Sequence, residues 1–513
     1  MVQRNSRLVL LKNAIANVVR GSAAALVALI LPPFLVRAMS AEAFSVWMLV
    51  LQISAYTAFL DFGIQTAVGR FVAHTTELDD RAERNRVIST SLSLLLGATL
   101  LAAAVMALLA WQLPNLFPEL PAQFHHDARI ALLIVGGGAA LGLPASIFNS
   151  IFIGLQRNAI PAAIIAGARL ISAFLLIVAA YGGSSIITMA VVITAVNLLS
   201  YGVQYWAYQR LALNVQVAPA LISRQTARDI FSYCFSLSIW TFAGFLVTGM
   251  DIMLVGIFDF QAVGYYAIGA SLITFIMGMQ SALFSTLIPE AAILGARENA
   301  GQLGSMLITS TRYGLFILLI SGLPLIVGAE TILTWWVGPD YAAHSALLLQ
   351  ILVAANIIRL ALLPYAMLLI GTGQQRLVTV TPFAEGGTNL LVSLIAGAML
   401  GAVGVAIGTL VGAIVGVICH LVVNMPRTAG IAVEPRRYLK DGLLRPALCA
   451  LPFLLISLGL LPVETLPPGA LMALVGVATL ASIALFWRWG LEAAEQRAVA
   501  RLLAYPLHAL SRK

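Results

Sequence analysis

Gly154-Leu155-Gln156-Arg157 is repeated as Gly373-Gln374-Gln375-Arg376, and the two tetrapeptides are 219 residues apart. A second pair of segments, 39–47 and 258–266, is separated by the same 219 residues. They include the similar runs Ala43-Phe44-Ser45-Val46-Trp47 and Ala262-Val263-Gly264-Tyr265-Tyr266. Two distant segments that keep one offset indicate a duplicated unit with no net insertion. Duplicated hydrophobic halves are the usual build of transporters, in which the binding site lies between the halves.

The composition is that of an integral membrane protein. Of 513 residues, 60% are hydrophobic and 10% are charged, and the mean hydropathy is +0.96, whereas soluble domains are about one quarter charged. Apolar runs of roughly 20 residues, enough to cross a bilayer, recur between short polar breaks. No pattern of short alternating strands is present, so the predicted fold is all-α. We predict about fourteen transmembrane helices, at residues 13–37, 43–72, 87–113, 128–155, 159–181, 186–208, 229–256, 263–289, 304–333, 344–371, 377–399, 403–425, 442–461 and 469–489.

The duplication groups these helices into two lobes. We predict an N-terminal six-helix lobe at 1–209, a cytoplasmic interlobe linker at 210–228 and a C-terminal six-helix lobe at 229–425. An even number of helices in each lobe places the pseudo-twofold axis along the membrane normal. Residues 426–513 then hold a loop, two additional helices that the repeat does not explain, and a cytoplasmic tail.

Basic residues concentrate in alternate loops, which predicts the orientation. The opposite loops have almost none, apart from Arg37 and Arg129 at helix ends. The excess of Lys and Arg marks the cytoplasmic side, so both termini are expected in the cytoplasm, and the net charge of +8 does not argue for nucleic acid as a partner. The basic set comprises Arg4, Arg7, Lys12, Arg81, Arg84, Arg86, Arg157, Arg210, Arg224, Arg228, Arg297, Arg376, Arg427, Arg436, Arg437, Lys440, Arg497, Arg501, Arg512 and Lys513.

The sequence offers little for an enzyme, a metal site or a cofactor. The three cysteines, Cys234, Cys419 and Cys449, lie in apolar helices, where a small hydrophobic side chain is the ordinary role. The histidines have no metal-ligand spacing. The longest breaks, 210–228 and 426–441, are too short for a catalytic domain, and no nucleotide-binding, metalloprotease or nucleophile-elbow motif occurs. We therefore expect no enzymatic activity, no metal and no organic cofactor.

Seven charged residues fall inside the predicted helices and away from the helix ends. Each costs roughly 3 kcal/mol at the centre of a membrane helix, so they need a structural or functional reason. They are Arg20, Arg169, Arg312, Arg359, Asp61, Asp251 and Glu385.

Depth places most of these charges in one layer. Counting about 1.5 Å per residue, Arg20 lies ~10 Å from the cytoplasmic helix end, Arg312 and Glu385 lie ~12 Å deep, Arg169 lies ~15 Å deep, and Arg359 lies near the middle. Arginine pairs its planar fork with phosphate oxygens and stays charged in a dry site. We predict that these four arginines bind a diphosphate. The alternative is internal pairing with Asp61 or Glu385, but four cations against two acids leave at least two positive charges for an anionic ligand or water.

Two stretches resemble a known family. Residues 59–73, FLDFGIQTAVGRFVA, resemble the D-x-G…R-x-x-A segment of bacterial polysaccharide flippases of the O-antigen type. Residues 251–256, DIMLVG, which lead to AVGYYA at 262–267, are similar to the junction of their seventh and eighth helices. The motifs recur in a wider superfamily that includes multidrug exporters and lipid II flippases.

The resemblance implies a V-shaped pair of bundles around a cationic cavity in the inner membrane of a bacterium. It implies transfer of an undecaprenyl-diphosphate oligosaccharide to the periplasmic leaflet for surface polysaccharide synthesis, with membrane lipids, a polymerase and glycosyltransferases as partners. The tail is expected to thread a gap between helices one and eight. Asp61, Asp251 or Glu385 would bind H⁺ or Na⁺, or act as a gate. The rival functions are a cation-coupled multidrug exporter, which should place acids in its cavity, a lipid II flippase, and a non-transporting scaffold.

Overall fold

The computed structural model describes residues 21–210, 215–378, 380–428, 430–431, 433–457, 466–493 and 495–497. It is 88% helical, and the described residues form no strand. Twelve helices in this part of the chain are long and apolar enough to cross a membrane. The all-α membrane fold is thereby confirmed. Described helices lie within each of the fourteen predicted spans, but those at 229–256 and 442–461 are not among the twelve, so the count of fourteen is approximate. Residues 13–20 and 458–461 of these spans lie outside the described residues.

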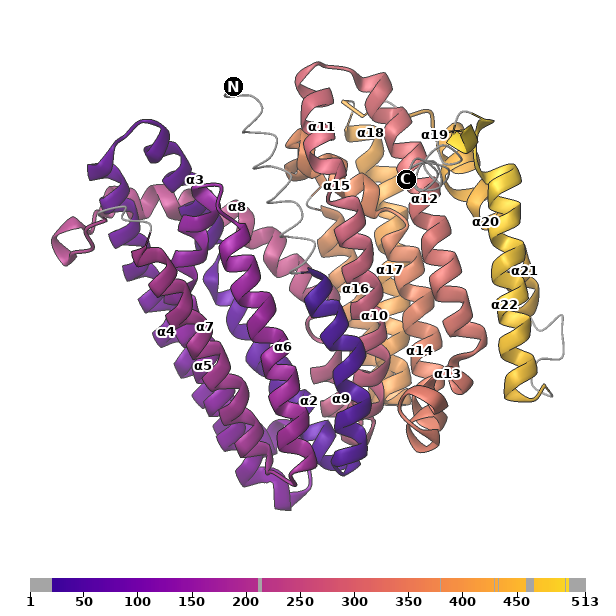
Figure 1. Cartoon of the computed structure of the whole chain (residues 1–513), viewed down its shortest axis with the longest axis horizontal. Helices are drawn as coiled ribbons and strands as arrows, with labels where there is room; N and C mark the ends of the chain where they lie inside the picture. The colour runs from indigo at the N-terminus through magenta and orange to yellow at the C-terminus, as the bar shows by residue number, and fades with distance from the viewer. Residues whose placement is uncertain are drawn as a thin grey trace, which may run out of the picture.

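Figure 1 shows two groups of helices side by side, followed by a short C-terminal group. The first lobe consists of Gly21–Ala38, α2 (Ala41–Ala55), α3 (Ile64–Glu77), α4 (Arg81–Leu116), α5 (His125–Gly154), α6 (Ala159–Tyr181) and α7 (Ile186–Gln209). The second lobe consists of α8 (Arg224–Thr248), α9 (Asp251–Phe258), α10 (Val263–Phe284), α11 (Leu287–Ala296), α12 (Ala300–Val327), α13 (Ala329–Trp336), α14 (Pro339–Leu360), α15 (Leu363–Thr372), α16 (Val380–Leu400) and α17 (Ala402–Cys419). The last group consists of α18 (Met425–Arg427), α19 (Pro435–Arg437), α20 (Arg445–Cys449), α21 (Leu451–Ser457) and α22 (Pro468–Leu485).

Residues 219 positions apart adopt the same local structure. Ser40 and Asp259 each cap a helical segment by accepting a hydrogen bond from the backbone N–H three residues later. Asp79 and Glu298 both have positive φ angles, 48° and 53°. Shared caps and shared turns at one offset support the duplication of the two lobes.

The two lobes are joined at one end. The backbone N–H of Gly264 donates to Ser45 Oγ at 3.0 Å, and these residues are themselves 219 positions apart, as expected for equivalent residues that meet at a pseudo-twofold axis. Nearby, the N–H of Phe260 donates to Glu119 at 3.0 Å. One apolar cluster spans both lobes here and includes Phe44 and Trp47. We call this region the joined end.

At the opposite end the lobes have separate cores, except that the first part of α8 packs with the first lobe. This end carries the loops with Arg81, Arg157 and Arg297, and we call it the basic end. One cluster there packs first-lobe residues with Ile230 and Cys234 of α8, whereas another consists of second-lobe and C-terminal residues. In Figure 1 the ribbons of the lobes diverge towards the basic end. The molecule is therefore sealed at the joined end and divided at the basic end.

The first helix and α10 make a close interlobe contact. A Cβ atom added to Gly278 would lie 3.1 Å from the Cβ of Ala25 and 3.8 Å from the carbonyl oxygen of Gly21. Because glycine and alanine let two backbones approach, no gap separates these helices at this level. The prediction that a lipid tail threads between helices one and eight is wrong for this part of the contact.

Candidate functional site

Asp251 lies at a break in the seventh membrane crossing, between α8 and α9. Its carboxylate is buried and accepts hydrogen bonds from the hydroxyls of Tyr266 and Thr409, both at 3.1 Å, and from the amide of Asn389 at 3.3 Å. Among the described residues it makes no ion pair. The sequence suggested a gate or a cation site. The structure places Asp251 inside the second lobe, surrounded by oxygen and amide groups from α10, α16 and α17.

Helix α16 presents a polar stripe towards this site. Its buried polar residues, Thr381, Glu385, Asn389 and Ser393, are spaced by four and so share one helix face. Ser393 donates to the Asn389 side-chain oxygen at 3.0 Å, and Asn389 also donates to the carbonyl of Val247 at 3.0 Å. The stripe therefore joins α16 to the end of α8 and holds the Asn389 amide against Asp251.

Glycines of α17 allow this close packing. A Cβ atom at Gly408 would meet Ser393, one at Gly412 would meet Asn389, and one at Gly416 would meet Glu385, all within 2.9 Å. The glycines recur every fourth residue on the face that contacts α16. Polar groups of α16 are thus buried against backbone rather than against side chains.

Arg359 of α14 is paired with Glu385. Its Nε lies 2.5 Å from Glu385 Oε1, and both side chains are about nine-tenths buried, at 11% exposure. One terminal nitrogen, NH2, has no hydrogen-bond partner. Glu385 neutralises Arg359, whereas the hydrogen-bond partners of Asp251 among the described residues are all neutral. One negative charge then remains for a cation or a proton, and buried charges require such compensation.

Asp61 has a structural role in the geometry observed. It ends the 3₁₀ turn Tyr56–Asp61, and its carboxylate accepts the backbone N–H of Gln65 at 3.2 Å, at the start of α3. Phe62 and Gly63, with φ of 50° and 79°, produce the break between α2 and α3. The Asp-Phe-Gly sequence therefore interrupts the second crossing and caps the helix that follows.

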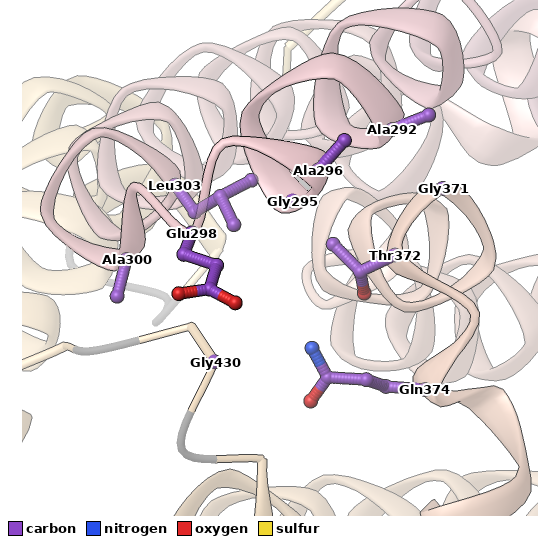
Figure 2. Close-up of a pocket in the computed structure, with 10 residues that line it drawn as sticks. All are labelled: Ala292, Gly295, Ala296, Glu298, Ala300, Leu303, Gly371, Thr372, Gln374 and Gly430. Atoms are coloured by element: carbon purple, nitrogen blue, oxygen red, sulfur yellow. The ribbon is translucent and has the colours of Figure 1, made fainter.

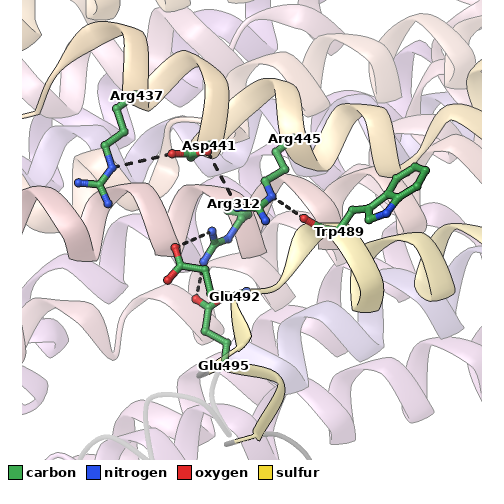
Figure 3. Close-up of polar contacts among 7 residues, drawn as sticks. All are labelled: Arg312, Arg437, Asp441, Arg445, Trp489, Glu492 and Glu495. Carbon is green, nitrogen blue, oxygen red and sulfur yellow. Dashed lines mark hydrogen bonds and ion pairs between the residues drawn. The ribbon is translucent and has the colours of Figure 1, made fainter.

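Arg312 lies on the side of the second lobe that faces the C-terminal helices (Figure 3). It is 1% exposed and pairs with Glu492 at 3.5 Å and with Glu495. Around it, Arg445 donates to the carbonyl of Trp489, and the rings of Phe316 and Phe486 stack at 3.8 Å. The cluster fastens the C-terminal segment to α12.

The four arginines do not form one group. Arg312 and Arg359 have carboxylate partners, and the pairing of Arg359 with Glu385 is the internal pairing that the sequence left as the alternative. Arg20 lies outside the described residues. Arg169 lines a cavity in the first lobe, away from Arg312 and Arg359. Counting residues along a helix gives depth but not direction, and the carboxylates of Glu492 and Glu495 come from the predicted tail, so the sequence argument could not pair them.

The first-lobe cavity has a volume of about 280 Å³ and lies among α3, α5, α6 and α7. Arg169 is its one charged lining residue among those described, and the other polar groups are amides and hydroxyls. They are Gln65, Ser146, Asn149, Asn197, Ser200, Tyr201 and Gln204. Sequence reasoning found Arg169 but missed these neutral residues, although Asn197, Ser200, Tyr201 and Gln204 recur at helical spacing.

A second cavity, of about 250 Å³, lies at the basic end (Figure 2). Its lining consists mainly of small residues at the ends of α11 and α15, and Glu298 is its charged residue. The Glu298 carboxylate and the Gln374 amide point towards one another across it. Because the one charge among its described lining residues is negative, this cavity does not suit a phosphate.

Comparison with known proteins identifies related sequences and folds. A family model described as polysaccharide biosynthesis protein matches residues 10–292. No curated protein matches the chain. Among solved structures, the lipid II flippase MurJ in an inward closed conformation aligns with a TM-score of 0.66 and 14% identity, covering 94% of this chain and 98% of that one.

Two other solved structures are similar. A multidrug resistance MATE family transporter of the MOP superfamily, in an inward-facing conformation, has a TM-score of 0.57 and 15% identity over 79% of this chain and 93% of its own. A MOP superfamily transporter from Pyrococcus furiosus Vc1, noted for the reverse polarity of its binding pocket, has a TM-score of 0.56 and 15% identity, with coverage of 83% and 96%. These likenesses show that the fold is that of MOP superfamily transporters.

Proposed function

Since the chain belongs to the polysaccharide biosynthesis protein family, we propose that it is a flippase for lipid-linked oligosaccharides. The proposed substrate is an undecaprenyl-diphosphate oligosaccharide, moved from the cytoplasmic to the periplasmic leaflet of a bacterial inner membrane without chemical change. The basic end is the cytoplasmic side in this proposal, because basic loops mark that side. A polymerase and glycosyltransferases would act after and before this step.

The observation that carries the proposal is the first-lobe cavity, whose one charged lining residue among those described is Arg169. A site for cationic drugs would place acids there, whereas an arginine with amides and hydroxyls suits a phosphate joined to sugars. Lobes that are sealed at the joined end and divided at the basic end support entry of this head group from the cytoplasmic side. The apolar tail would stay in lipid, since each CH₂ moved into water costs about 0.8 kcal/mol.

We further propose that Asp251 binds the coupling ion, H⁺ or Na⁺. A carboxylate with neighbouring hydroxyl and amide groups offers the oxygen ligands that hard cations prefer, and it can equally take up a proton. Arg359 and Glu385 neutralise each other, so the carboxylate of Asp251 still needs one positive charge. This need supports the binding of a cation or a proton at Asp251. Glu385 then serves as the partner of Arg359, and Asp61 serves as a helix cap.

The test is transfer of labelled lipid-linked oligosaccharide by purified protein in vesicles. Arg169→Gln should slow transfer about tenfold or more, since hydrogen bonds to charged groups contribute about 1.5–3 kcal/mol. Arg129→Gln, an exposed arginine at the joined end whose NH2 donates to the carbonyl of Trp111 at 3.2 Å, is the matched control and should leave transfer unchanged.

Three outcomes would contradict the proposal. Equal transfer rates for the Arg169→Gln variant and the wild type would show that the cavity takes no part in transfer. Export of cationic drugs without lipid transfer would identify a multidrug exporter. Preferential transfer of lipid II would identify a lipid II flippase.

A further inference from the structure

The first-lobe cavity contains more polar groups than a diphosphate needs. Its lining supplies four side-chain amides and three hydroxyls in addition to Arg169. Gln204 is only 3% exposed, and its Nε2 donates to Ser200 Oγ at 3.4 Å. Each buried amide costs free energy unless it is hydrogen-bonded, and its carbonyl oxygen, unlike its N–H groups, cannot pair with an ionised phosphate.

One buried acceptor in this cavity is unsatisfied. The side-chain oxygen of Asn149 on α5 is buried and has no hydrogen-bond partner. Leaving a buried acceptor unpaired costs about 1–3 kcal/mol. The missing partner must be a donor, and the O–H and N–H groups of a ligand are donors, whereas the oxygens of an ionised diphosphate are not. A ligand group that satisfies this oxygen would therefore come from a part other than the phosphate.

The shape of the cavity is set by the local structure. The break at Phe62 and Gly63 starts α3 so that Gln65 lines one side. Gly142 of α5 leaves room for the Tyr201 hydroxyl, since a Cβ atom there would come within 2.4 Å of it. The polar groups are thus held on four helices around a volume of about 280 Å³. Ile165 is the one large aliphatic side chain of the lining, so an apolar tail is poorly matched to it.

We infer that this cavity is a saccharide subsite, in which Asn149, Gln204 and their neighbours bind hydroxyl or acetamido groups of a sugar while Arg169 binds the adjoining phosphate. The inference rests on the proposed flippase function and assigns binding of the sugar to the first lobe. Buried groups that hydrogen-bond a substrate hydroxyl discriminate strongly against analogues lacking it, because the site's own polar groups are then left unpaired.

The experiment compares two ligands of the purified full-length protein in lipid nanodiscs. One is lipid-linked oligosaccharide extracted from the host membranes, and the other is undecaprenyl diphosphate without sugar. Asn149→Leu and Gln204→Leu should each weaken binding of the glycosylated lipid about tenfold and leave binding of the sugar-free lipid unchanged. Arg169→Gln should weaken both. Asn115→Leu, at an exposed asparagine near the joined end, is the control and should change neither.

Two smaller substitutions test the same site with less risk of disturbing the fold. Ser200→Ala and Ser146→Ala remove single hydroxyls and should weaken only the glycosylated lipid, by a smaller factor. If the wild type binds both lipids and all cavity variants bind the glycosylated one normally, the saccharide subsite is wrong and the flippase function stands. If the wild type binds neither lipid, the proposed function fails as well.

Discussion

Asp251 is a buried carboxylate whose hydrogen-bond partners, Tyr266, Thr409 and Asn389, are all neutral. Its charge is therefore balanced from elsewhere or by a bound ion. Burying an unpaired charge is costly, and a membrane protein retains such a residue where the charge is used. The same reasoning separates Asp251 from Glu385, which has its own arginine.

Asp251→Asn should abolish the coupling of transport. The amide keeps the size of the carboxylate and can still accept one hydroxyl hydrogen bond, but it can neither take up a proton nor balance a cation. We expect transfer driven by an ion gradient to fall about tenfold or more, while binding of the lipid persists. Vesicle assays with imposed Na⁺ or pH gradients measure this. Asp340→Asn, an exposed acid in the first turn of α14, is the control, and an unchanged gradient response in Asp251→Asn would exclude the coupling role.

Sequence reasoning identified which residues carry charge within the membrane but not which of them meet. Arg169, Arg312 and Arg359 were correctly placed inside helices, and of these three Arg169 lines a cavity described above. Residue counts along a helix give the depth of a side chain in the membrane. Which residue it pairs with depends on the rotation of the helix and on which helices are its neighbours. The pairing of Arg312 with the C-terminal segment depends on tertiary packing that the local sequence does not encode.

At the scale of elements, the contact of α16 with α17 depends on residues that lack side chains. The every-fourth-residue pattern of polar groups on α16 and of glycines on α17 is visible in the sequence, although no prediction was drawn from it. Breaks in helices were harder to predict. Each interruption, at Phe62 or before Asp251, occurs within an apolar run that hydropathy reads as one continuous span.

Gly412→Val should destabilise the second lobe. The new side chain would clash with the Asn389 Cβ and the Glu385 carbonyl oxygen, both 2.9 Å from an added Cβ atom, and overpacking costs about 1–3 kcal/mol. Gly387→Val on α16 is the matched control, because nothing lies within 4 Å of an added Cβ atom there. Heating followed by size-exclusion chromatography compares the two. Equal losses of monodisperse protein would show that the contact of α16 with α17 does not limit stability.

For the whole molecule, the sequence repeat predicted the two-lobed architecture. It did not predict which end would be joined, because a transporter of this build has more than one arrangement of the same lobes and one sequence encodes all of them. Ser45 and Gly264 are equivalent positions of the repeat. Their hydrogen bond indicates that the pseudo-twofold axis passes between them at the joined end.

A cross-link at this contact should hold the lobes in the arrangement described. In a background with Cys234, Cys419 and Cys449 replaced by serine or alanine, Ser45→Cys with Gly264→Cys should form a disulfide on oxidation and stop transfer. A reductant should restore it. Either single substitution serves as the control. If the cross-linked protein transfers lipid at the normal rate, separation of the joined end is not part of the transport cycle.

The pairing of Arg312 with the C-terminal segment has a consequence for how the protein is made. Glu495 follows Arg312 by 183 residues, so a ribosome has released α12 into the membrane long before the neutralising carboxylates exist. During that interval the nascent chain carries a guanidinium without its final partners, at a position that becomes 1% exposed. Chains cut short before Glu492 would keep Arg312 without these partners. Membrane proteases could distinguish such chains from complete ones by this unpaired charge.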